Sequence, residues 1–181
     1  MEGIMKKYFL FGIMIIPVLI RCSSMKIMAN YDREVDFSQY QTFQFVGDKD
    51  SPGRGGKGIH NPLFTKDVMY QIRPVMEAKG FTEVENRDEA DILIHFNAFV
   101  KNRREYVPPT YRIGRWRRVW RARPGHVVDY KEGTLIIDIV DRARKEMVWQ
   151  GVGQGVLDRD NPARNLAEAA SDILAHFPPA Q

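Results

Sequence analysis

The alternation of apolar and polar positions predicts six β-strands along the chain. The even-numbered side chains from Ile92 to Val100 share one face of the clearest one, and we expect that face to meet the core. The predicted strands cover residues 25–32, 41–46, 81–84, 91–101, 130–141 and 147–157. Among their side chains we expect burial of Ile94, Phe96, Ile137 and Ile139, and at least half burial of Trp149.

Two segments show helical spacing of apolar residues instead, and each follows an Asn-Pro pair. The first covers residues 62–79, and the second begins at Pro162 and ends before residue 178. Asparagine is a favoured N-cap, and proline fits the first turn of a helix. Pro74 lies inside the first segment and removes a backbone hydrogen bond there, so we expect that helix to kink or split.

The predicted element order is therefore ββαββββα, which indicates an α+β fold. The simplest packing is an antiparallel sheet of about five to six strands with both helices on one face. Residues 23–181 are long enough for a single domain of this kind with its own core.

The first two dozen residues have the layout of an export signal. Two lysines precede an apolar run over residues 8–20, and Cys22, the only cysteine, follows. A helix over this run reaches about 20 Å, short of the roughly 30 Å hydrocarbon core, so a cleaved signal fits better than a spanning helix. We expect residues 1–22 to form a signal segment that ends at a lipid-modifiable Cys22.

Arg21 departs from the usual signal, in which a small residue precedes the cysteine. A charge beside the cleaved bond should slow or block a peptidase that works in the bilayer. The alternatives are an uncleaved or differently cleaved signal, or a cytosolic protein with a buried first helix. Met5, directly before the lysines, fits the start of such a signal better than Met1 does.

The net charge of +4 conceals an uneven distribution. Residues 101–123 contain nine Lys and Arg against one acid, Glu105, and so carry +8. The rest of the chain after the signal contains fifteen basic and twenty-one acidic residues, a charge of −6. We interpret residues 101–129 as a basic insertion and expect it to project as an arm between two strands of the sheet.

Arginines alternate with tryptophan and tyrosine in this insertion. Arginine binds phosphate through its planar guanidinium, and the two aromatic types suit the membrane interface. A cytosolic protein with this pattern could bind nucleic acid, but an exported one meets lipopolysaccharide, phospholipid head groups and acidic wall polymers. The alternative is a solvated loop whose charge serves solubility. The candidate anion-binding residues are Arg115, Arg117, Arg118, Arg121, Trp116 and Trp120.

The sequence offers no catalytic or metal-binding constellation. Its four histidines lack ligand spacing, no serine has a nucleophile pattern, and the glycine-rich run 53–58 lacks the spacing of a phosphate loop. We therefore expect no enzymatic activity, no metal and no cofactor. Aspartates at strand ends are expected to bind backbone N–H groups in turns, and these are Asp32, Asp36, Asp91, Asp138 and Asp141.

Three glycines, at positions 151, 153 and 155, alternate along the last predicted strand. A dinucleotide-binding loop needs a tight turn into a helix, which is missing here. We expect these glycines to let a helix or a neighbouring aromatic such as Trp149 lie close on the sheet.

Short motifs spread along the chain after the signal make up a recognisable ensemble. They include Tyr31-Asp32, Asp36-Phe37-Ser38, Lys79-Gly80-Phe81, Ala90-Asp91-Ile92-Leu93-Ile94, Glu132-Gly133-Thr134-Leu135 and Val148-Trp149 before Gly151. In these motifs the chain resembles the bacterial envelope family catalogued as domain of unknown function 4136, whose members are mostly small lipoproteins. The resemblance implies a secreted or lipid-anchored α+β domain without an established activity, and it assigns no role to the arginine-rich insertion.

These observations together predict a non-enzymatic protein of the cell envelope. We expect it to face the periplasm and to be anchored to the outer membrane through the lipid on Cys22. Its expected partners are the membrane itself and, through the insertion, an anionic lipid, lipopolysaccharide or an envelope protein. Nucleic acid is not expected.

Overall fold

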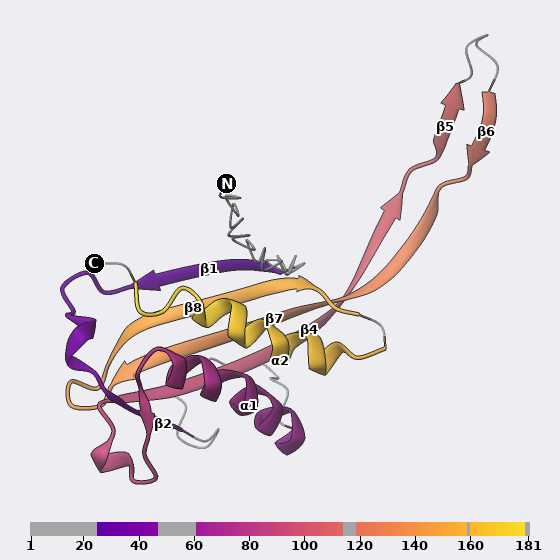
Figure 1. Cartoon of the computed structure of the whole chain (residues 1–181). Coiled ribbons are helices and arrows are strands. Elements are labelled where there is room, and N and C mark those ends of the chain that lie inside the picture. Colours follow the sequence, from indigo (N-terminus) through magenta and orange to yellow (C-terminus); the bar gives the residue numbers. More distant parts are fainter. Residues whose placement is uncertain (1–24, 47–60, 114–118, 159, 180–181) are drawn as a thin grey trace, which may run out of the picture.

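The computed structural model describes residues 25–46, 61–113, 119–158 and 160–179, in which a sheet and two helices form two layers (Figure 1). The sheet has six strands in the order β1-β8-β7-β4-β2-β3. These are β1 (Lys26–Tyr31), β2 (Thr42–Phe45), β3 (Thr82–Glu83), β4 (Ile92–Val107), β7 (His126–Asp141) and β8 (Glu146–Val156). The helices are α1 (Pro62–Ala78) and α2 (Pro162–Leu174), and β5 (Thr110–Ile113) pairs with β6 (Val119–Arg123) in a separate ribbon.

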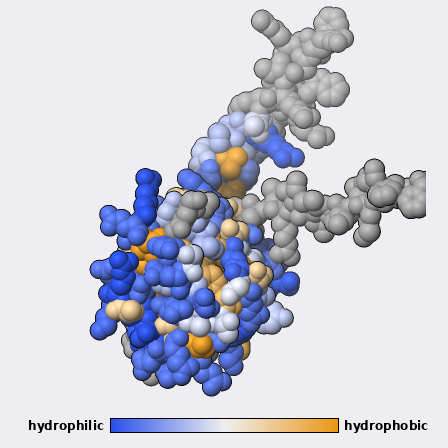
Figure 2. All heavy atoms as spheres, turned by 60° about the vertical axis from the view of Figure 1, so that its left-hand side comes forward, coloured by the Kyte–Doolittle hydropathy of each residue, from blue (hydrophilic) through white to orange (hydrophobic). Residues whose placement is uncertain are grey.

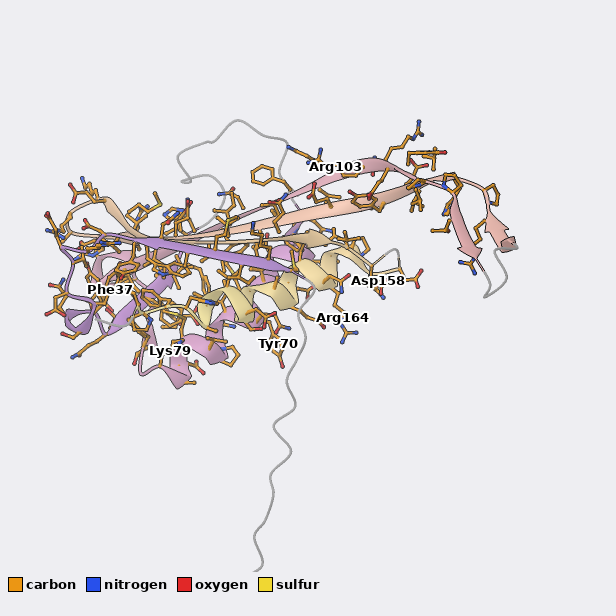
Figure 3. All side chains as sticks on the ribbon, turned by 90° about the horizontal axis from the view of Figure 1, so that it is seen from above. Phe37, Tyr70, Lys79, Arg103, Asp158 and Arg164 are labelled. Carbon is orange, nitrogen blue, oxygen red and sulfur yellow. The ribbon has the colours of Figure 1, made fainter. Side chains whose placement is uncertain are left out.

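The α+β class is confirmed, with six strands in the sheet and both helices on one of its faces (Figures 1 and 3). The expectation of a purely antiparallel sheet is wrong, because β2 is parallel to both β3 and β4. The reason is the connection through α1. A strand, helix, strand crossover returns the chain in its original direction, so the flanking strands lie parallel.

The core lies between the sheet and the helices. Ile94, Ile137, Ile139 and Trp149 are almost completely buried there, as the alternation predicts. Phe96, also expected to be buried, is only partly buried and packs against this core. On the opposite face of the sheet, Leu93 is buried in a smaller cluster with Val46 and Ala90.

Helix α1 runs without interruption across Pro74, so the predicted split does not occur. Pro74 is exposed, and so is Tyr70, the residue four positions earlier whose carbonyl oxygen loses its usual intrahelical partner. Water can bind that carbonyl on the solvent side, which explains why the helix continues. Asn61 caps α1 by accepting a hydrogen bond from the Leu63 N–H at 2.9 Å, whereas Asn161 makes no such bond at α2.

Gly151 and Gly153 of β8 allow close packing, as predicted. A Cβ at Gly151 would overlap Ile173 of α2 and the ring of Trp149, and one at Gly153 would lie 2.9 Å from Cδ1 of Ile173. The Trp149 ring also meets Phe177 edge-on, with centroids 5.4 Å apart. Helix α2 therefore rests directly on the backbone of β8, and the aromatic cluster closes this end of the core.

Replacement of Ile137 by alanine should lower the free energy of unfolding by about 2–5 kcal/mol, because the fully buried side chain leaves a cavity. Urea unfolding followed by circular dichroism measures the change. Ile136→Ala is the matched control, since Ile136 is adjacent on the uncovered face and only partly buried. Equal losses in the two variants would mean that the helices do not cover the face assigned to them.

Candidate functional site

A long β-ribbon leaves one end of the sheet (Figure 1). It begins where β4 and β7, each 16 residues long, extend past their other partners and continue as a pair. Their register runs from Ile92 opposite Asp141 to Val107 opposite His126. We call residues 101–132 the arm, its paired part (101–107 with 126–132) the stem, and residues 108–125 the tip.

The basic insertion thus forms an arm between two sheet strands, as expected, but its secondary structure was not foreseen. The strands were predicted to end at residue 101 and to restart at residue 130, whereas the pairing extends to Val107 and His126. The stem faces solvent on most of its surface, so no core imposes the apolar alternation by which the other strands were found.

Two ion pairs cross the stem. Nε of Arg103 lies 2.6 Å from a carboxylate oxygen of Glu132, and Nε of Arg104 lies 2.8 Å from one of Asp129. The hydrogen bonds from Arg103 and from the Gln154 amide hold the pKa of Glu132 below its ordinary value. The stem therefore balances much of its own charge. The register of β4 and β7 brings these partners together over separations of 29 and 25 residues, which no local pattern in the sequence indicates.

An aromatic contact marks the junction of stem and tip. A Cβ at Gly125 would overlap the hydroxyl group of Tyr106 and lie 3.1 Å from Pro109, so the tyrosine ring lies across the glycine backbone. Tyr106 is nevertheless 63% exposed, and Val127, opposite it in register, is 54% exposed. Figure 2 shows apolar surface on the arm amid hydrophilic residues.

The tip concentrates positive charge. Between Glu105 and Asp129 the chain has six arginines and no acid. In the described backbone of the tip, Arg112 stands directly opposite Arg121, and Thr110 stands opposite Arg123. Like charges in direct cross-strand register destabilise a ribbon.

The candidate residues from the sequence are only partly within the described structure. Trp120 and Arg121 lie in β6, so their backbones belong to the outer ribbon. Arg115, Trp116, Arg117 and Arg118 fall outside the described residues, and so does the predicted lipidation site, Cys22. All six anion-binding candidates belong to the tip, beyond the ion pairs of the stem.

A hollow of about 640 Å³ lies at the other end of the sheet, on the face without helices. Leu93, Val140 and Met147 contribute its apolar lining, and Arg87, Arg142 and Lys145 contribute cations. Asp88 and Asp141 offset much of that charge. Arg142 already donates through Nε to the Ala90 carbonyl oxygen at 2.6 Å, so part of its bonding capacity serves the fold.

Most aspartates at strand ends bind backbone N–H groups, as predicted. Asp32 accepts from the Glu34 N–H, and Asp36 accepts from the Ser38 N–H. Asp141 accepts from the Arg144 N–H and from the Tyr40 hydroxyl, and burial together with this bond raises the pKa of Tyr40 to about 12. Asp138 differs, because it accepts a hydrogen bond from the Gln150 side chain.

The described part of the chain contains no group of three or more His, Cys, Asp or Glu side chains placed to hold a metal ion. Nor does any helix in that part have the length and apolar character to cross a membrane.

A family model described as "Domain of unknown function (DUF4136)" matches residues 27–179, nearly all of the described structure. The chain belongs to the DUF4136 family. Among curated proteins there is no match to the sequence.

Similar solved structures come from several bacteria. A PDZ domain protein from Parabacteroides distasonis is 16% identical with a TM-score of 0.57, and the match covers 88% of this chain and 36% of that protein. A DUF4136 family protein from Bacteroides thetaiotaomicron is 15% identical, with a TM-score of 0.46 and coverage of 82% and 92%. PelC from Paraburkholderia phytofirmans, a dodecamer, is 8% identical, with a TM-score of 0.45 and coverage of 87% and 99%. At 16% identity the similarity to the Parabacteroides protein concerns the fold alone.

Asp91 should make the stability of the fold depend on pH. Burial alone would raise the pKa of Asp91. The backbone N–H groups of Gln41 and Thr42 donate to one of its carboxylate oxygens at 2.8 and 2.9 Å and stabilise the charged form. These hydrogen bonds outweigh the effect of burial, so the pKa of Asp91 is lowered. Its stabilisation is thus complete above the unfolded pKa of about 4 and is lost as the pH falls through the lower folded value.

Replacement of Asp91 by asparagine should lower the free energy of unfolding at pH 7 by about 1–3 kcal/mol and flatten its decline on the acid side. Urea unfolding at several pH values measures both effects. Asp88→Asn, in the exposed turn Arg87–Glu89, is the control. An unchanged acid profile in Asp91→Asn would show that this carboxylate does not couple folding to pH.

Proposed function

We propose that this DUF4136 protein is an exported, lipid-anchored component of the cell envelope that binds phosphate-bearing lipids through the tip of its arm. The observation that carries the proposal is the run of six arginines without an acid between Glu105 and Asp129. Arg112, Arg121 and Arg123 lie on a ribbon that stands away from the body of the protein (Figure 1).

The contrast between stem and tip supports binding over mere solubility. The stem cations Arg103 and Arg104 each have a carboxylate partner, whereas the tip has no acid in its sequence. Evenly distributed charge would serve solubility without placing Arg112 opposite Arg121. Phosphate accepts bidentate hydrogen bonds from arginine, and tryptophan and tyrosine favour the head-group region of a bilayer.

Export and anchoring rest on the signal-like segment that ends at Cys22. In an envelope, the phosphates within reach belong to phospholipid head groups and lipopolysaccharide. Both present the same chemistry to the tip, and vesicles with and without lipopolysaccharide distinguish them. An envelope protein as the partner, which the sequence leaves as an alternative, would bind the arm without phosphate.

The anchor predicts a lipid-modified N-terminus at Cys22 in the native protein. Mass spectrometry of the protein purified from membranes identifies the modification. Arg21→Gly should speed processing if the arginine impedes the peptidase. An N-terminus without lipid at or before Arg21 would contradict the anchor, and unchanged processing in the variant would contradict the role of Arg21.

The arm predicts salt-dependent binding to anionic vesicles. Each arginine near an anionic surface contributes about 1 kcal/mol, so substitution of Arg115, Arg117, Arg118 and Arg121 by serine should weaken binding by about a thousandfold at low salt. Binding should also fall steeply with added salt, since screening limits its reach to about 8 Å at physiological ionic strength. Co-sedimentation of the mature chain with phosphatidylglycerol vesicles measures both effects.

A matched variant separates the tip from the overall charge. Serine at Arg33, Lys66, Lys79 and Arg164 removes four exposed cations from the body of the protein and gives the same net charge. It should retain most of the vesicle binding. Equal losses in the two variants, or no vesicle binding by the unmodified chain, would identify the arm as a solvated structure without affinity for lipid phosphate.

A further inference from the structure

The N-terminal end of the described chain and the base of the arm lie at the same end of the sheet. Lys26 at the start of β1 pairs with Gln154, which pairs with Thr134, and Thr134 pairs with Phe99. This row crosses the sheet just before the arm begins. The C-terminal end lies opposite, since Phe177 packs on Trp149, and Trp149 pairs with Tyr31 and Ile139 (Figure 1).

This arrangement limits how an anchored protein can sit on a bilayer. Four residue steps lead from Cys22 to Lys26, so the tether spans at most about 14 Å. The far end of β7 at Asp141 is seven residues beyond Thr134, or about 23 Å away. An anchor at Cys22 therefore prevents the protein from standing upright on the far end of the sheet.

The length of the arm excludes an orientation in which the arm points straight into the membrane. Fourteen residues from Phe99 to Ile113 extend about 46 Å, far more than the tether. Pointed along the membrane normal, the arm would drive its arginines into the hydrocarbon core, where each charge costs several kcal/mol. An arm that lies along the bilayer surface avoids this cost.

The two faces of the stem differ in exposed apolar side chains and in net charge, the two properties that favour contact with an anionic bilayer. One face carries Tyr106 and Val127, both more than half exposed, together with Arg104, Lys131 and Asp129, so its charge is +1. The other carries Lys101 and Arg103 against Glu105 and Glu132, so its charge is zero. Its Tyr130 and Val128 are only partly exposed. Figure 3 shows Arg103 on the side of the sheet away from the helices.

We infer that the stem binds the bilayer through the face that carries Tyr106 and Val127, with the arm lying along the membrane. This inference rests on the anchor in the proposed function. The close approach of the Tyr106 ring to the Gly125 backbone fixes the ring on that face, so its exposed part is held in position for the head-group region. Arg104 and Lys131 on the same face suit anionic lipid.

Neighbouring valines provide a matched test, because Val127 and Val128 point to opposite faces of β7. The full chain with Val127→Cys or Val128→Cys is labelled with the environment-sensitive dye NBD and reconstituted in phosphatidylethanolamine and phosphatidylglycerol vesicles. A lipid-modified Cys22 has no free thiol to react. The dye at position 127 should shift its emission to the blue and be quenched by lipid-bound quenchers, while the dye at 128 should report water.

Exchange of the tether tests the geometry independently. The mature chain with Cys22→Ser is attached to nickel-chelating vesicles through a hexahistidine tag at either its N-terminus or its C-terminus. Dye at position 127 should enter the bilayer interface only with the N-terminal tether. Equal signals at 127 and 128, a stronger signal at 128, or equal signals from both tethers would overturn the inference.

The outcome separates this inference from the proposed function. A mature chain that ignores anionic vesicles in solution, but whose position 127 enters the interface when anchored, would refute binding by the tip and leave the stem contact standing. Vesicle binding in solution with position 127 in water would refute the stem contact and leave binding by the tip standing. Tyr106→Ser with Val127→Ser should reduce the quenching of dye placed at Arg104→Cys, whereas Tyr130→Ser with Val128→Ser on the other face should not.

Discussion

Sixteen residue pairs join β4 to β7, and both parts of the molecule depend on this ladder. Its inner half forms the centre of the sheet, where Ile94, Ile137 and Ile139 are completely buried. Its outer half becomes the stem, where the same backbone hydrogen bonds continue although no helix covers either face (Figure 1). One uninterrupted register therefore connects the core to the tip, so the tip is held by the best-buried strands of the fold.

The strand beside this ladder explains how the core closes. Because Gly151 and Gly153 have no side chains, Ile173 of α2 approaches the backbone of β8 directly. The Trp149 ring lies beside Gly151 and meets Phe177. Phe177 in turn packs edge-on against Phe37, with ring centroids 5.8 Å apart. Phe37, Trp149 and Phe177, which are distant in the sequence, thus share one aromatic cluster. Helix α2 is held against the sheet by the contact of Ile173 with the β8 glycines and, beyond its C-terminal end, by Phe177 in this cluster.

The sequence is informative wherever a core imposes a period on it. Alternation locates the inner parts of β4, β7 and β8, and the glycine spacing predicts the close approach of Trp149 and α2. The same criterion fails in the stem, because residues such as Asn102 and Arg104 face water, and alternation then has no energetic basis. The mixed sheet was missed because strand direction depends on the crossover through α1, which leaves no trace in the pattern of β2 itself.

The candidate site follows the same division. Charge alone identifies the arm, since a run of arginines without acids is a property of the sequence. The partners Arg103 and Glu132 are 29 residues apart, and Arg104 and Asp129 are 25 apart, so only the register of β4 and β7 reveals that the stem neutralises itself. The exposure of Tyr106 and Val127 likewise depends on where the helical layer stops, which no local pattern records.

The unequal support of the two central strands has a mechanical consequence. A pull on the tip along the arm loads β4 and β7 together, parallel to their length, and must be resisted by the strands on either side. β7 is held by β8 through ten residue pairs, whereas β4 is held by β2 through three. Such a force would separate β4 from β2 first, while β8 and helix α2 stay attached to β7. The sheet therefore resists a pull on the arm more strongly on the β8 side than on the β2 side.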